Sequence, residues 1–204
     1  MLVATLAACG QDGATVSLPG PPGTDVLRRG NATEPQSLDP HRGEGVPSAN
    51  IQRDLFEGLI NTAADGSLIP GAAAEWTVSE DGRTYSFTLR EDARWSNGDP
   101  VTAQDFVFSL RRAVDPATLS NYSQILAPIV NANAVITGAR PPEDLGVEAP
   151  GPRELVIRLA DPTPYFLELL THSMAYPVHP PTVQARPKDF ARPGRLVSNG
   201  PYML

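Results

Sequence analysis

Apolar residues in one segment near the start of the chain recur with helical spacing. Ser48 is a suitable N-cap, and the apolar positions after it lie three or four residues apart or next to one another: Ile51, Leu55, Phe56, Leu59 and Ile60. This spacing predicts a helix with a buried apolar face. The preceding residues 34–47 contain Pro35, Pro40 and Pro47, which disfavour helical backbone in the residues before them. We therefore expect an extended, polar loop followed directly by an amphipathic helix.

Strict alternation of apolar and polar residues marks the segments that follow. Residues 76–78 and 85–89 alternate on either side of an Asp-Gly pair at 81–82, which predicts an antiparallel hairpin. A second Asp-Gly pair, flanked by apolar residues within 61–70, is another hairpin signal. Residues 155–159 alternate in the same way and predict a further strand.

Helical patterns return between and after these strands. Thr102 and Asp105 resemble a capping box, with Asp in place of Glu, ahead of an apolar face within 106–114. A second helix is expected over 128–136, and a third from 163 onward, where proline occupies the tolerated first position. The mixture of hairpins and helices indicates a mixed α/β fold, in the α+β sense.

Composition and charge narrow the functional classes. The 204 residues include 22 prolines and 17 glycines, which favour a core with many loops over a helical bundle. A net charge of −7 argues against a nucleic-acid partner. No apolar run is long enough to span a bilayer.

The single cysteine lies in an informative place. Leu6-Ala7-Ala8-Cys9 looks like a bacterial lipobox, in which the cysteine is lipidated and becomes the mature N-terminus. The alternative is a chance cysteine in an alanine-rich leader. Only eight residues precede Cys9 and none is basic, so we expect the true start to lie upstream. Residues 1–25 are then a lipoprotein signal remnant and a flexible tether that holds the protein at a membrane surface.

One long stretch, EPQSLDPHRGEGVPSANIQRDLFEGLI at 34–60, closely resembles the start of the oligopeptide-binding proteins of bacterial ABC importers, within bacterial extracellular solute-binding protein family 5. The resemblance continues through PGAAAEWTVSEDGRTYSFTLREDARWSNGDPVTAQDFVFSLRRAVDP at 70–116, ELVIRLADPTPYFLELL at 154–170 and VSNGPYML at 197–204. A chance motif match would not preserve this colinear order over 26–204.

The resemblance implies a periplasmic-binding-protein-like type II bilobal fold. Residues 26–56 and 180–204 would be parts of a split first lobe, and 57–179 an inserted smaller α/β lobe. In this family the position of Leu204 is well before the middle of the polypeptide. We therefore expect an N-terminal part of a longer chain, without the second main lobe.

The resemblance also implies a set of ligand-binding residues. Glu44 falls where the family places an acidic residue that faces the bound peptide, and Val46 falls where a backbone group pairs with the peptide main chain. Gly45, which lies between them, is counted among the ligand-binding residues. Tyr122 matches a tyrosine that lines the cleft, and His172 would line it further along. From the residues alone, Glu44 could be simply solvated, Tyr122 a packing residue and His172 a surface histidine.

An enzyme is not expected. The chain has no G-x-S-x-G elbow, H-E-x-x-H pair or glycine-rich phosphate loop. Three histidines, His41, His172 and His179, form a poor metal set without cysteine partners, so we expect no metal and no cofactor.

These inferences predict the substrate-binding component of a peptide ABC transporter, located in the periplasm or at the outer face of the cytoplasmic membrane. Its partners would be an oligopeptide ligand, the permease and ATPase subunits and, through a lipid anchor, the membrane; we expect a monomer. The alternatives within the family are receptors for dipeptides, murein peptide, glutathione or a nickel chelate. From another class, a surface lipoprotein with chaperone-like or adhesive peptide binding stays open.

Overall fold

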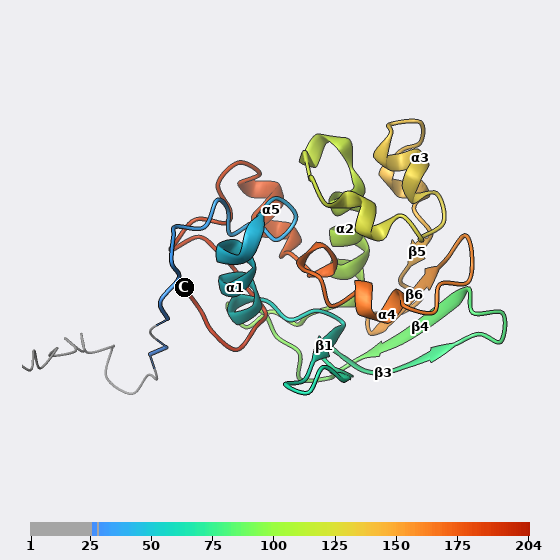
Figure 1. The fold of residues 1–204 in the computed structure, drawn as a ribbon, viewed down its shortest axis with the longest axis horizontal. Helices are drawn as coiled ribbons and strands as arrows, with labels where there is room; N and C mark the ends of the chain where they lie inside the picture. Colours follow the sequence, from blue (N-terminus) through green and yellow to red (C-terminus); the bar gives the residue numbers. More distant parts are fainter. Residues whose placement is uncertain (1–25, 28) are drawn as a thin grey trace, which may run out of the picture. The chain divides into compact units, whose positions relative to one another are not determined.

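The computed structural model describes residues 26–27 and 29–204, and residues 31–204 form one compact unit, which is the second of two along the chain. The predicted lipidation site, Cys9, and the tether lie outside the described residues. All that follows concerns the second unit (Figure 1). Within the described part of the chain, no helix has the length and apolar character needed to cross a membrane.

The main sheet has four antiparallel strands in the order β3-β4-β6-β5. Their bounds are β3 Ala73–Val78, β4 Thr84–Leu89, β5 Val147–Glu148 and β6 Glu154–Arg158. The hairpin expected at 76–89 and the strand expected at 155–159 are thus confirmed.

A second, two-stranded sheet pairs β1 (Ile60–Thr62) with β2 (Leu68–Pro70). Asp65 accepts hydrogen bonds from the backbone and hydroxyl of Ser67, at 3.0 and 2.7 Å. The neighbouring glycine, Gly66, has φ +88°, a conformation that L side chains rarely adopt. The hairpin signal within 61–70 is therefore confirmed.

Helix α2 (Ala103–Val114) packs against the four-stranded sheet (Figure 1). Both bonds of its capping box form: Thr102 Oγ1 accepts from the Asp105 backbone N–H at 3.4 Å, and Asp105 Oδ2 accepts from the Thr102 N–H at 2.9 Å. Trp95 Nε1 donates to the same Asp105 carboxylate at 3.1 Å. The predicted N-terminus of this helix is confirmed.

The core forms largely between α2 and the main sheet. The largest fully buried side chains are Leu59, Ile60, Phe87, Leu89, Phe106, Leu110, Leu126, Ile129, Leu155, Ile157, Phe166 and Leu170. Burial of each such side chain contributes roughly 1.5–3 kcal/mol relative to exposure. The mixed α/β class is confirmed, whereas the lobe boundaries stay a prediction.

Helix α1 (Gly45–Leu55) begins earlier than predicted. Its N-cap is Glu44, whereas Ser48 is buried inside the helix. Pro47 is accommodated because it lies in the first turn of the helix, where a backbone N–H would have no intrahelical acceptor. The predicted apolar face was also too long, since the helix ends at Leu55 and the buried residues beyond it lead into β1.

The remaining helices are short. They are η1 (Pro116–Thr118), η2 (Ser123–Leu126), α3 (Ala132–Ile136), η3 (Pro142–Asp144), α4 (Phe166–Leu169), η4 (Ser173–Ala175) and α5 (Pro180–Ala185). The helix expected over 128–136 is only partly correct, because Asn131 is left-handed at φ 65° and delays its start to Ala132. The helix expected from 163 exists but covers only α4.

Candidate ligand-binding site

A buried network fastens the loop that precedes α1 to the rest of the unit. Arg112 donates to both carboxylate oxygens of Asp39, at 3.0 and 2.6 Å, and to Nδ1 of His41 at 2.8 Å. Because arginine can only donate, the His41 proton lies on Nε2, which donates to the Tyr176 carbonyl at 3.0 Å. The loop is thereby joined to the last turn of α2 and to the segment after η4.

The environment sets the charges in this network. Burial lowers the pKa of His41 to about 4, and the nearby Arg112 charge adds to the effect, so His41 is neutral at pH 7. Burial alone would raise the pKa of Asp39, but the hydrogen bond and charge of Arg112 hold it below its ordinary value. Sequence reasoning missed this network and considered His41 only as part of a poor metal set.

The same loop is fixed to α1. Gln52 Nε2 donates to the Asp39 carbonyl at 3.1 Å and to the Ser37 carbonyl at 3.4 Å. A Cβ atom at Gly43 would overlap the Gln52 amide, so only glycine allows this close approach. These contacts determine where the next residue, Glu44, is presented.

Glu44 lies half-buried at the N-terminus of α1 with extended backbone, φ −121° and ψ 153°. Its Oε1 accepts a hydrogen bond from Asn121 Nδ2, in the segment between η1 and η2. The side chain does not cap its own helix. The next two residues, Gly45 and Val46, are exposed, Val46 to 69%.

Tyr122 and His172 meet beside this contact. Their rings are 5.6 Å apart between centroids at 64°, an edge-to-face arrangement. His172 Nδ1 accepts from the Met174 backbone N–H at 3.1 Å, so the neutral ring carries its proton on Nε2. Burial lowers the pKa of His172, which favours this neutral form. Glu44 contacts Asn121, the sequence neighbour of Tyr122, and Tyr122 contacts His172, so these three predicted residues lie in segments that contact one another.

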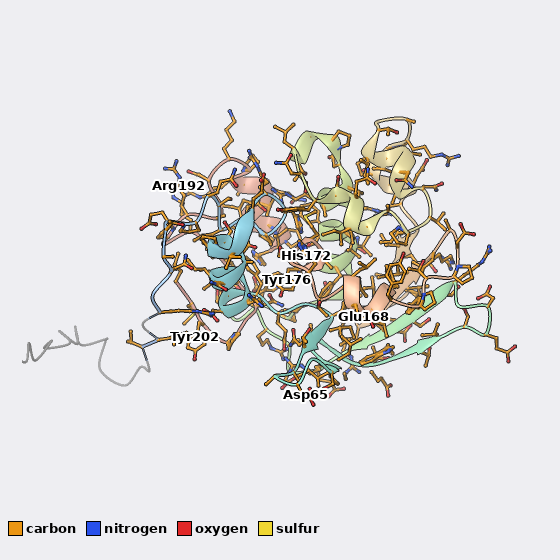
Figure 2. The ribbon with its side chains drawn as sticks, in the orientation of Figure 1. Asp65, Glu168, His172, Tyr176, Arg192 and Tyr202 are labelled. Carbon is orange, nitrogen blue, oxygen red and sulfur yellow. The ribbon has the colours of Figure 1, made fainter. Side chains whose placement is uncertain are left out.

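A cavity of 350 Å³ begins at His172. It is lined by Ala49, Arg53, Ile125, Glu168, Leu169, Thr171, His172, Ser173 and Tyr176. His172 and Tyr176 come from the segment after α4 and lie close to α1 (Figure 2). In the described residues, no group of three or more His, Cys, Asp or Glu side chains could hold a metal ion.

Comparison with known proteins places this fold in a class. The profile of the middle region of bacterial extracellular solute-binding proteins, family 5, matches residues 67–204. The chain therefore belongs to this family, whose members bind solutes and are not enzymes.

Within the family, the chain is similar to oligopeptide-binding proteins. It is 45% identical over 181 residues to the periplasmic oligopeptide-binding protein OppA of Escherichia coli, a match that covers 88% of this chain and 33% of OppA. The structure of OppA of Haemophilus influenzae in complex with RPPGFSPFR matches with a TM-score of 0.83 and 44% identity, over 85% of this chain and 34% of that one.

The structure of the murein tripeptide binding protein MppA of Escherichia coli is nearly as similar. It matches with a TM-score of 0.81 and 44% identity, over 84% of this chain and 34% of that one. The chain thus spans about a third of the length of the relatives it matches.

Proposed function

We propose that the chain forms one wall of the peptide-binding cleft in the substrate-binding component of a peptide ABC transporter. The observation that carries this proposal is the cluster of Glu44, Tyr122 and His172, which three separate segments bring together. Similarity to proteins named for oligopeptide binding supports peptide as the ligand.

The chemistry of the cluster suits main-chain recognition. The first backbone N–H groups of a helix have no intrahelical partner, so those of Gly45 and Val46 are available to carbonyl groups of an extended peptide. Glu44 places a carboxylate beside them, and Tyr122 adds an aromatic surface. Such contacts are common to all peptides and allow loose side-chain specificity.

The proposed wall would face a cleft between the predicted lobes of the complete receptor. Residues 26–56 and 180–204 would belong to the first lobe and 57–179 to a smaller inserted lobe, with the opposing wall supplied by a second main lobe. Ligand would close the receptor by hinge motion, a population shift driven by contacts made only in the closed state. The closed receptor, held by lipid on Cys9, would then dock on a permease driven by an ATPase.

A murein-peptide receptor is the second candidate. MppA is as similar to this chain as the oligopeptide receptors are, with 45% identity over 173 residues. Both candidates share the same wall and differ in ligand.

Titration calorimetry on the complete gene product tests the proposal. Tri- to pentapeptides of unrelated sequence should release or absorb heat with one-to-one stoichiometry. Murein tripeptide in the same assay separates the two candidates. The absence of binding by every peptide would refute peptide capture.

A further inference from the structure

The cavity at His172 shares lining residues with a larger one. The second cavity, of 760 Å³, extends to Glu57, Arg90 and Asn199 beneath the β1–β2 hairpin. Both cavities are lined by Arg53, Thr171 and Tyr176. The two cavities therefore adjoin at these three residues, and together they are named the groove; it borders the proposed peptide site at His172 and the C-terminal half of α1.

Two of the three arginines in this groove are already occupied. Arg90 is paired with Glu57 at 2.9 Å and with Asp92 at 3.6 Å. Arg94 donates to two backbone carbonyls of its own loop, at 2.8 and 2.9 Å.

Arg53 differs from both. Its side chain donates to Asn50 Oδ1 at 3.1 Å, and no carboxylate lies within ion-pair distance of it in the described part of the chain. Glu168 also lines the smaller cavity, but within the described part of the chain it forms no ion pair with Arg53. Most of the five N–H donors of the Arg53 guanidinium thus remain available at the junction of the two cavities.

Two other residues that line the smaller cavity, His172 and Tyr176, are also donors. His172 carries its proton on Nε2, because Nδ1 is used by the Met174 N–H. The Tyr176 hydroxyl makes no hydrogen bond in the described residues, and burial raises the pKa of this phenol, so it stays protonated. The Arg53 charge opposes that rise, and both side chains line the same two cavities. Three hydrogen-bond donors, one of them the Arg53 cation, favour a ligand group that accepts hydrogen bonds and carries negative charge.

We infer that Arg53, which lines the smaller cavity together with His172 and Tyr176, binds a carboxylate of the captured ligand. The inference rests on the proposed function and adds a specificity to it: the groove prefers peptides that place an acidic group at this point. The carboxylate can come from an Asp or Glu side chain or from the peptide C-terminus, and both present the same planar pair of oxygens to the guanidinium.

Calorimetry on the complete gene product tests the inference with matched peptides. Tetra-alanine is the parent peptide, and Glu replaces Ala at each of its positions in turn. Each Glu peptide is compared with the peptide that carries Gln at the same position. The parent itself is compared with its C-terminal amide. At one position or at the C-terminus, the charged form should bind roughly tenfold or more tightly than the neutral form. Arg53→Gln should abolish that preference, so that the charged and neutral peptides bind with equal affinity, whereas Arg53→Lys should retain part of it.

Arg83→Gln is the matched control, since it removes the same charge from the exposed end of β4 and should leave the preference intact. A preference that survives Arg53→Gln, or no preference at any position, would overturn the inference while peptide binding stands. If no peptide binds at all, the proposed function and the inference fail together. The Glu-to-Gln and acid-to-amide comparisons identify which carboxylate is bound.

Discussion

The carboxylate of Asp39 and the guanidinium of Arg112 form two hydrogen bonds, Oδ1 to Nη1 at 3.0 Å and Oδ2 to Nη2 at 2.6 Å, across 73 positions of sequence. Both side chains are largely buried, with exposed fractions of 6% and 13%. This pair joins the loop that presents Glu44 to the end of α2. It therefore links the position of the proposed ligand-binding residues to the stability of the core.

Arg112→Met should destabilise the protein strongly. The change leaves the Asp39 carboxylate buried without its partner and removes the cation–π contact of Arg112 with Phe190, at 5.2 Å. Loss of one member of a buried ion pair costs about 3–5 kcal/mol. Urea unfolding followed by circular dichroism measures the difference in free energy of unfolding.

Two variants sharpen this experiment. Arg83→Met breaks an exposed pair with Asp161 and should cost about 1 kcal/mol or less. The double variant Asp39→Asn/Arg112→Met removes both charges and should be less destabilised than the two single changes added together. Equal costs for Arg112→Met and Arg83→Met would show that the buried pair does not stabilise the fold.

His41 should make stability depend on pH in mildly acidic solution. Its pKa is about 4 in the folded chain against an ordinary value of 6.5, so the unfolded chain binds the proton more readily. The stabilisation is complete above pH 6.5 and is lost as the pH falls towards 4. Each pKa unit corresponds to about 1.4 kcal/mol, so the loss is on the order of 3 kcal/mol.

His41→Gln isolates this effect. Glutamine does not titrate, so the free energy of unfolding should change less between pH 6.5 and 4.5 in the variant than in the parent. Glu57, whose pKa burial raises, and His172, whose pKa burial lowers, are present in both proteins and cancel in the difference. Parallel pH profiles for the two proteins would contradict the assignment to His41.

Local signals predicted most of the fold. The capping box at Thr102 and the Asp-Gly turn at 81–82 act within a few residues, and both elements formed as expected. The start of α1 was misjudged because proline was taken to exclude a helix, although Pro47 lies in the first turn, where the missing N–H costs nothing. The spacing of apolar residues likewise could not show that Leu59 and Ile60 lie beyond the end of the helix, because both would be apolar and buried whether or not they were helical.

Contacts across long sequence separations could not be predicted in this way. In the sequence, Arg112 is a basic residue in the last turn of a helix, where positive charge is generally favourable. Nothing local indicates its pairing with Asp39. The contact between Glu44 and Asn121 spans 77 positions, and Asn121 had no signal at all. Resemblance to a family selected Glu44, Tyr122 and His172, and the structure then showed which side chains support them.

Gly200→Ala should destabilise the protein through a backbone clash. A Cβ atom at Gly200 would lie 2.5 Å from the carbonyl carbon of Leu55 and 2.6 Å from the Phe56 nitrogen, where the end of α1 meets the C-terminal segment. Because backbone cannot yield as a side chain can, the cost should be about 1–3 kcal/mol. Gly151→Ala meets only the Glu154 side chain, at 3.5 Å, and serves as the control in the same unfolding assay. Similar stability of the two variants would contradict the close approach.

Glu44→Gln should weaken peptide binding without weakening the fold. The Glu44 side chain caps no helix and, in the described residues, accepts one hydrogen bond, from the Asn121 amide, which a glutamine side-chain carbonyl can also accept. The free energy of unfolding should therefore stay within about 0.5 kcal/mol of the parent. Removal of the negative charge at the mouth of the proposed cleft should raise the Kd for peptides roughly tenfold, as measured by calorimetry on the complete gene product.

Glu80→Gln provides the matched control, because Glu80 is an exposed acid in the turn after β3. It changes the net charge by the same amount, so a general effect of charge on association would appear in both variants. Tyr122→Ala removes the ring that packs edge-to-face against His172 and should also raise the Kd. If Glu44→Gln and Tyr122→Ala bound peptides as tightly as Glu80→Gln, the ligand would have to lie elsewhere on the protein, because neither the carboxylate at the N-terminus of α1 nor its aromatic neighbour could then contribute to recognition.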